Sequence, residues 1–172
     1  MSYAELKIVE ENGDVVGYKK YKNSHGGAAF IWTQLYDKYL KDHNISHDSW
    51  LFGGDKLWKL SSDKSVPYFA RKVLASTYDQ VIIKRENLFD LVESFEKFLE
   101  VFSSSKNIVC HLFNWIEDIR EIYKDNFCQG IAFYQMSVGQ DPWWVYDNED
   151  EGRPYNLEKD EGHWFLFDEI EE

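Results

Sequence analysis

An Asn-Gly turn early in the chain is the sequence feature that most restricts its fold. Asn12-Gly13-Asp14 stands between two β-prone runs, residues 6–11 and 15–21. An Asn-Gly pair flanked by such runs is the strongest short-range signal for a β-hairpin, because both residues tolerate the positive φ angles of a tight hairpin turn. The sequence therefore predicts an antiparallel hairpin over residues 6–21.

Three later segments show the 3.6-residue apolar spacing of amphipathic helices. They are residues 28–41, 86–102 and 108–123. The polar loop between the last two, residues 103–107, is short, which favours an antiparallel helical pair. A shorter helix is expected to follow Pro67. These helices are long enough to cover one face of a small sheet.

Further β-prone runs occupy residues 81–83, 130–138, 143–146 and 163–170. Together with the hairpin they predict an α+β fold over residues 1–172 as a single domain. In this fold a small, mainly antiparallel sheet, built from the N-terminal hairpin and the C-terminal strands, packs against the three long helices. The length of the chain agrees with this fold, because a domain of this size can bury about 70% of its unfolded surface and needs neither a disulfide nor a metal to be stable.

Cysteine content and hydropathy indicate the compartment. Cys110 and Cys128 are the only cysteines, fewer than a small disulfide scaffold carries. The first residues contain no apolar stretch typical of a signal peptide, and no run approaches the roughly 18 apolar residues of a membrane span. We therefore expect a cytoplasmic protein with reduced thiols, no membrane association and no cofactor.

Charge is distributed unevenly along the chain. The net charge is −12, yet residues 1–85 carry 13 basic and 10 acidic side chains, whereas residues 86–172 carry 6 and 21. Residues 147–172 alone hold 11 acids and 2 bases, an acidic, loop-rich segment. Binding a duplex takes clustered Lys and Arg, so this charge argues against nucleic acid as the direct partner. It suits a basic protein partner.

Aromatic residues surround the acidic segment. Aromatic anchors rimmed by charge supply affinity and steering at protein interfaces. The leading hypothesis is a non-catalytic acidic protein-binding module, such as a phage- or bacterium-encoded inhibitor or immunity protein that engages a basic, nucleic-acid-handling protein. The alternative is that the aromatics are core and the acids only confer solubility. The candidate interface residues are Trp143, Trp144, Tyr146, Asp147, Glu149, Asp150, Glu151 and Tyr155.

The turn before the first long helix is a second candidate site. Asn23, Ser24, His25, Gly26 and Gly27 precede a helix N-terminus, which offers free N–H groups to an anion, and glycines let a ligand approach the backbone. The pattern is neither a P-loop nor a dinucleotide fingerprint. It indicates either a small-molecule-binding protein or enzyme with a site here, or a capped helix start.

Three weaker signals complete the candidates. His43 and His47 have zinc-like spacing but lack a third ligand. The stretch from Asp147 to Glu158 partly matches a calcium loop, although Glu replaces Asp or Asn at two ligand positions and Pro154 breaks the pattern. No nucleophile, base and acid stand in a catalytic motif.

Direct nucleic-acid binding is a third function class, and it requires the basic residues of the first half to gather on one face. Those residues are Lys19, Lys20, Lys22, Arg71, Lys72, Lys84 and Arg85.

Three blocks of sequence resemble a group of small bacterial and phage proteins for which no activity is known. The blocks are residues 23–28, residues 66–79, and residues 134–138 with residues 141–143. The resemblance implies a cytoplasmic bacterial or phage setting and supplies no catalytic residues. It also implies that the polar residues of the three blocks converge in space.

Overall fold

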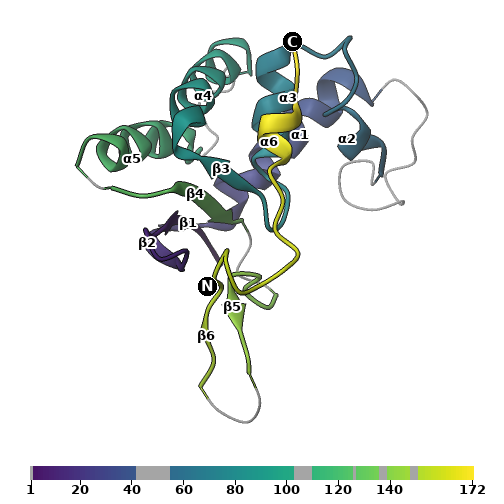
Figure 1. Cartoon of the computed structure of the whole chain (residues 1–172). Helices are drawn as coiled ribbons and strands as arrows, with labels where there is room; N and C mark the ends of the chain where they lie inside the picture. Colours follow the sequence, from purple (N-terminus) through teal and green to yellow (C-terminus); the bar gives the residue numbers. More distant parts are fainter. Residues whose placement is uncertain (1, 42–54, 103–109, 126, 136–138, 148–150) are drawn as a thin grey trace.

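The computed structural model describes residues 2–41, 55–102, 110–125, 127–135, 139–147 and 151–172. Strands and helices come in short runs along the chain, and two short 3₁₀ helices, η1 and η3, precede long helices (Figure 1). The elements are β1 (Tyr3–Val9), β2 (Val15–Lys22), η1 (Ser24–Gly26), α1 (Ala28–Tyr39), α2 (Asp55–Lys59), α3 (Tyr68–Ala75), β3 (Ile82–Lys84), η3 (Arg85–Asn87), α4 (Leu88–Phe102), α5 (Leu112–Asp125), β4 (Gly130–Tyr134), β5 (Trp144–Val145), β6 (Arg153–Pro154) and α6 (Leu166–Glu169).

The predicted hairpin is confirmed. β1 and β2 pair antiparallel, with Val9 opposite Val15, and the turn between them holds Gly13 at φ 91°. The Asn12 side chain accepts a hydrogen bond from the Asp14 backbone N–H at 3.0 Å, which closes the turn locally. The turn forms where the sequence predicts it because both of its requirements, a positive φ and a side-chain cap, are met within three residues.

The main sheet has the order β2-β1-β4-β3, and all three pairings are antiparallel. β4 is buried along its whole length, between β1 and β3. A Cβ atom added at Gly130, the first residue of β4, would lie 2.4 Å from the Ile83 carbonyl oxygen of β3. Glycine at this position therefore lets the first residue of β4 pair with the last residue of β3.

Helices cover one face of this sheet (Figure 1). Trp115 of α5 is fully buried, with its ring centroid 4.7 Å from that of Phe133 in β4 and 5.7 Å from that of Phe95 in α4. α4 packs on both α3 and α5. The α+β class, the N-terminal hairpin and the long helices packed on an antiparallel sheet are thus confirmed. Within the described residues, no helix is long and apolar enough to cross a bilayer.

The C-terminal segment covers the other face of the sheet. A second apolar cluster joins Val9, Ile82 and Ala132 of the sheet to Trp143 and Tyr155. Each strand of the sheet therefore has buried side chains on both faces, which is why β4 reads as a continuous apolar run.

Two expectations about the C-terminal strands differ from the structure. Residues 163–170 do not form a strand: Trp164 makes one bridge to Val81, and the chain then turns into α6. The helical turn buries Phe167 and brings its carbonyl oxygen within 2.6 Å of Lys72 Nζ, and these contacts override the β-prone composition. Residues 143–146 do contain a strand, β5, but it pairs with β6 outside the main sheet.

Candidate functional site

β5 and β6 form a short arm, residues 144–154, that projects from the body on the side away from the helices (Figure 1). Trp144 lies opposite Pro154, and Val145 lies opposite Arg153. Residues 148–150, which include the candidates Glu149 and Asp150, fall outside the described part of the chain. Flanking strands, where a calcium loop would have helices, separate this arm from the calcium-binding pattern.

Two of the candidate interface residues anchor the arm to the sheet. Trp143 is fully buried, and its Nε1 donates a hydrogen bond to the Phe133 carbonyl oxygen at 3.0 Å. Tyr155, also buried, meets the Trp143 ring edge-on at 5.3 Å between centroids. Asp141 joins the base as well, because its carboxylate pairs with the buried Lys7 of β1 at 3.0 Å. These side chains position the arm and do not reach a partner.

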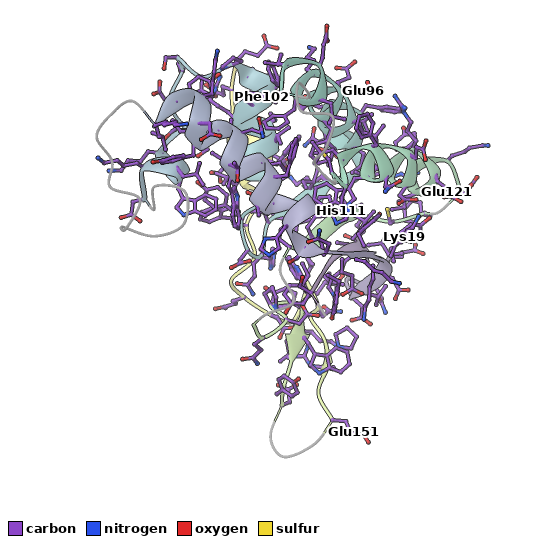
Figure 2. All side chains as sticks on the ribbon, turned by 180° about the vertical axis from the view of Figure 1, so that it is seen from behind. Lys19, Glu96, Phe102, His111, Glu121 and Glu151 are labelled. Atoms are coloured by element: carbon purple, nitrogen blue, oxygen red, sulfur yellow. The ribbon has the colours of Figure 1, made fainter. Side chains whose placement is uncertain are left out.

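The other described candidates are accessible. Trp144 and Tyr146 expose 37% and 64% of their area, and Asp147 and Glu151 are exposed beside them. Glu151 lies at the far end of the arm (Figure 2). Gly152 has a φ of +72°, and a Cβ atom there would collide with the Trp144 indole at 2.3 Å, so glycine lets the indole lie against the backbone.

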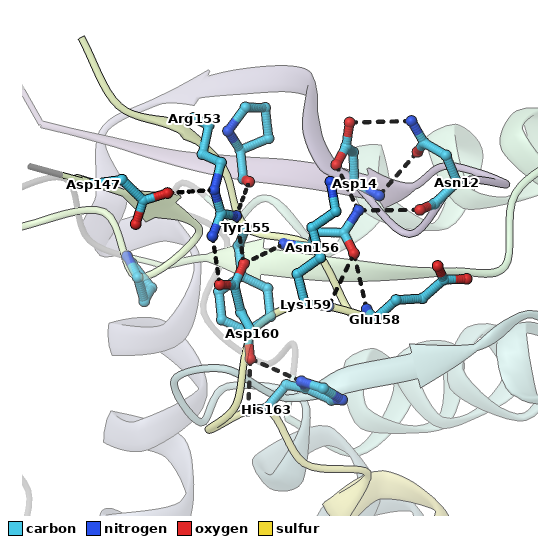
Figure 3. Close-up of polar contacts among 12 residues, drawn as sticks. Asn12, Asp14, Asp147, Arg153, Tyr155, Asn156, Glu158, Lys159, Asp160 and His163 are labelled. Atoms are coloured by element: carbon cyan, nitrogen blue, oxygen red, sulfur yellow. Dashed lines mark hydrogen bonds and ion pairs between the residues drawn. The ribbon is translucent and has the colours of Figure 1, made fainter. Parts of the chain in front are cut away.

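Arg153 braces the base of the arm from within (Figure 3). Its guanidinium bonds Asp147 at 2.7 Å and holds Asp160 through two nitrogens, at 2.6 and 2.7 Å. Asp160 accepts a further hydrogen bond from the Asn156 backbone N–H at 2.8 Å. These bonds stabilise the carboxylate and lower the pKa of Asp160 from 3.8 to about 2. Two acidic residues of the segment, Asp147 and Asp160, thus form ion pairs within the fold.

A pH titration tests this brace. The pKa of Asp160 in the folded protein lies below its unfolded value, so its contribution to stability is present above about pH 4 and is lost as the pH falls toward about 2. We expect the Asp160 carboxyl carbon signal in NMR to titrate near pH 2, and near its ordinary value in Arg153→Gln. An Asp160 that titrates close to pH 4 with Arg153 intact would contradict the assignment.

Asn156 links the segment after the arm to the N-terminal hairpin turn (Figure 3). Its Nδ2 donates to the Asn12 carbonyl oxygen at 3.0 Å and to the Asp14 carboxylate at 2.8 Å. The Leu157 N–H donates to the Gly13 carbonyl oxygen at 2.9 Å. The first turn of the chain therefore holds the acidic segment in place, and nothing in the local sequence of either indicates this pairing.

The turn at residues 23–27 is packed against the start of α5. His111, itself buried, donates from its backbone N–H to the Gly26 carbonyl oxygen at 2.8 Å and from Nε2 to the Asn23 carbonyl oxygen at 2.6 Å. The Asn23 side chain accepts from the His25 N–H at 3.2 Å and caps η1. Ser24 is buried. These contacts are those of a capped, packed helix start.

Gly27 completes this packing, because a Cβ atom there would lie 3.0 Å from the Trp115 ring and 3.3 Å from Gln135 Oε1. No residue of the turn lines any of the four best-formed cavities among the described residues. A ligand site at this turn stays a prediction.

A cavity of about 520 Å³ lies next to the turn, on the far side of Gln135, and the sequence does not predict it. Its walls come from α1, α2, the residues after α3, the end of β4 and the approach to the arm. We call it the aromatic cavity. Its lining consists of Trp32, Trp58, Thr77, Tyr78, Asp79, Tyr134, Gln135, Gly139, Gln140, Pro142 and Trp164.

The candidate basic residues differ in exposure. Arg71 and Lys72 are buried in α3, and Lys72 pairs with Asp90 at 3.3 Å. Lys19 pairs with the buried Asp118 of α5 at 2.9 Å, and Lys84 pairs with Asp168, although both lysine side chains are about half exposed. Burial removes Arg71 and Lys72 from the groups available to a phosphate backbone.

The remaining chemical candidates find no support in the described residues. Burial raises the pKa of the Cys110 thiol to about 11, so the thiol stays protonated at neutral pH. In the part of the chain that the structure describes, no three His, Cys, Asp or Glu side chains stand close enough to hold a metal ion. His43 and His47 lie outside that part.

No protein-family model, no curated protein and no solved structure matches this chain. The resemblance to small bacterial and phage proteins therefore stays a prediction. The structure does bring parts of two of its blocks together, because Tyr78 and Asp79 line the aromatic cavity with Gln135 and Pro142.

Proposed function

We propose that this chain is a non-catalytic binding protein whose arm docks on a basic surface of another protein, in the manner of an inhibitor or an immunity protein. The proposal rests on the different exposure of neighbouring aromatic residues in and beside the arm. Trp143 is buried and fixes the base, while Trp144 and Tyr146 remain exposed beside carboxylates. Exposed aromatics on a fixed support, bordered by charge, are the usual energetic centre of an interface.

Preorganisation supports the proposal. Arg153 holds Asp147 and Asp160, and Asn156 fastens the segment that follows to the hairpin turn. An arm held in this way loses less conformational entropy on binding than a free loop would lose. Glu151, at the far end of the arm, is outside this network and keeps its charge available (Figure 2).

The charge of the chain supports a basic partner. The net charge is −12, and residues 147–172 contribute −9 of it. A concentrated negative field speeds the encounter with a positive surface and repels acidic competitors. Arg153, the basic residue of β6, is engaged with two carboxylates.

Capture from a bacterial or phage-infected lysate tests the arm. We expect the protein to retain a basic partner at about 0.1 M salt and to lose most of it at about 1 M, because the Debye length falls from about 10 Å to about 3 Å. The double variant Tyr146→Ala with Glu151→Gln is expected to lose the partner at both salt concentrations.

A matched control removes the same kinds of side chain elsewhere. Phe113 and Glu117, both exposed on α5, are replaced by Ala and Gln, on the helical side of the molecule. This control is expected to capture as the parent does. Capture that ignores salt, or that falls equally in both double variants, would rule out the arm as the interface.

A further inference from the structure

The walls of the aromatic cavity form a continuous row of rings. Trp32 meets Trp58 edge-on at 5.5 Å between centroids, and Trp58 meets Tyr78 at 4.3 Å. Tyr78 continues to Trp164 at 5.8 Å. Trp32 is held in place, because its Nε1 donates to Thr77 Oγ1 at 2.9 Å. The row is therefore a fixed aromatic surface and not a set of independent side chains.

A carboxylate contributes formal charge to this cavity. Asp79 is the one charged residue among the described residues of the lining, and it is exposed at the edge. Among the described residues, no cation lies within ion-pair distance of it. The surrounding protein excludes part of its water, and this desolvation raises the pKa of Asp79. A positively charged ligand would compensate the carboxylate in a way that no described side chain does.

Gln135 is a second polar group in the lining without a described partner. Only 4% of the residue is exposed, and within the described part of the chain neither its Oε1 nor its Nε2 has a hydrogen-bond partner. Buried amides are normally paired, so both atoms stand ready to bond a ligand. The terminal torsion of a glutamine side chain is soft, and its rotation exchanges the positions of Oε1 and Nε2, so the carboxamide can present either an acceptor or a donor.

We propose that the aromatic cavity binds an organic cation with a flat apolar body, which lies on the row of rings, places its charged nitrogen near Asp79 and hydrogen-bonds to Gln135. Aromatic faces attract cations through the ring quadrupole, most strongly at Trp. The volume of about 520 Å³ falls within the range of small-molecule sites. An anionic ligand would meet a carboxylate and no cation among the described residues of this lining.

This inference does not depend on the arm. Its lining residues differ from those of the proposed protein interface, and a free amine or an arginine side chain of another protein both present the required chemistry. Failure of the arm to capture a partner would therefore leave the cavity proposal standing, and the reverse also holds.

Binding of benzamidine, a flat aromatic cation, tests the proposal directly. The probe is titrated against the whole protein while the indole N–H signals of Trp58 and Trp164 are followed by NMR. We expect both signals to shift, and the neutral analogue benzamide to bind about tenfold more weakly, the scale of one desolvated cation–π contact. Acetyl-arginine amide and its neutral citrulline counterpart form a second pair, and the tighter of the two cations distinguishes a small aromatic cation from an arginine side chain of a protein.

Two variants assign the preference to Asp79. Asp79→Asn is expected to bring benzamidine within about twofold of benzamide, since the carboxylate that favours the cation is gone. Asp37→Asn, an exposed residue of α1 outside the lining, is expected to keep the full preference. Equal binding of charged and neutral probes by the parent, an unchanged preference in Asp79→Asn, or no shift with either cation up to about 10 mM, a generous ceiling for a fragment of this size, would each overturn the proposal.

Discussion

Replacement of Trp143 by alanine is expected to lower the free energy of unfolding by about 3–5 kcal/mol, as for other fully buried tryptophans. The ring is fully buried against the second face of the sheet, and its Nε1 satisfies the Phe133 carbonyl oxygen. Alanine leaves a cavity where Tyr155 packs and an unpaired carbonyl in β4. Urea denaturation followed by circular dichroism measures the change.

Trp144→Ala is the matched control for this substitution, because it removes the same side chain at the next position. Its indole is exposed and lies on Gly152, so we expect a loss below about 1 kcal/mol. The two variants distinguish a residue that stabilises the fold from a residue that contacts the partner. We expect Trp143→Ala to destabilise the fold, and Trp144→Ala to leave stability nearly intact and to weaken capture by the arm. Equal destabilisation by the two changes would show that Trp143 is not the anchor.

Replacement of Gly130 by alanine is expected to cost about 3 kcal/mol, the upper range for an added methyl group in a packed interior. The new Cβ atom would lie 2.4 Å from the Ile83 carbonyl oxygen, a backbone atom that is fixed by the pairing of β3 with β4. This clash can be relieved only if β3 and β4 separate where Lys84 pairs with Gly130. Thermal unfolding and amide exchange of Ile83 and Lys84 measure the effect.

Gly139→Ala is the control for an added methyl group in general. No atom lies within 4 Å of the Cβ position there, and we expect the free energy of unfolding to change by less than about 0.5 kcal/mol. A Gly130→Ala protein as stable as the Gly139→Ala protein would mean that β3 can move away from β4 without loss.

Local chemistry explains which elements the sequence predicts well. The turn at Gly13 needs only a positive φ and the neighbouring Asn12 side chain, and both are readable within a few residues. α4 and α5 follow apolar stripes that match their buried faces. Such features are fixed before the chain folds back on itself, so pattern and propensity suffice.

Long-range contacts explain the errors. Residues 163–170 have the composition of a strand, but burial of Phe167 against α3 and its bond to Lys72 favour a helical turn. β5 and its partner β6 also lie outside the main sheet, because Trp143 packs on the second face of the sheet directly before β5 begins. Neither contact can be predicted from the local sequence pattern.

The candidate site divides in the same way. Acid and aromatic content identified the arm, yet composition could not tell which aromatic is buried, and Trp143 and Trp144 are neighbours with opposite roles. The aromatic cavity could not be predicted from the sequence because its rings come from segments far apart in the chain, from Trp32 to Trp164. The high aromatic content, 17%, was its only signal.

The position of β1 inside the sheet has a consequence for synthesis of the chain. β1 pairs with β2 within its own hairpin, but its other edge pairs with β4, whose first residue is Gly130. At about 5–20 residues per second, the hairpin waits roughly 6–25 s on the ribosome before β4 is made. During that time the inner edge of β1, with the apolar Leu6 and Ile8, is open to other nascent chains. The strand order therefore leaves β1 without its second pairing partner until most of the chain has been made.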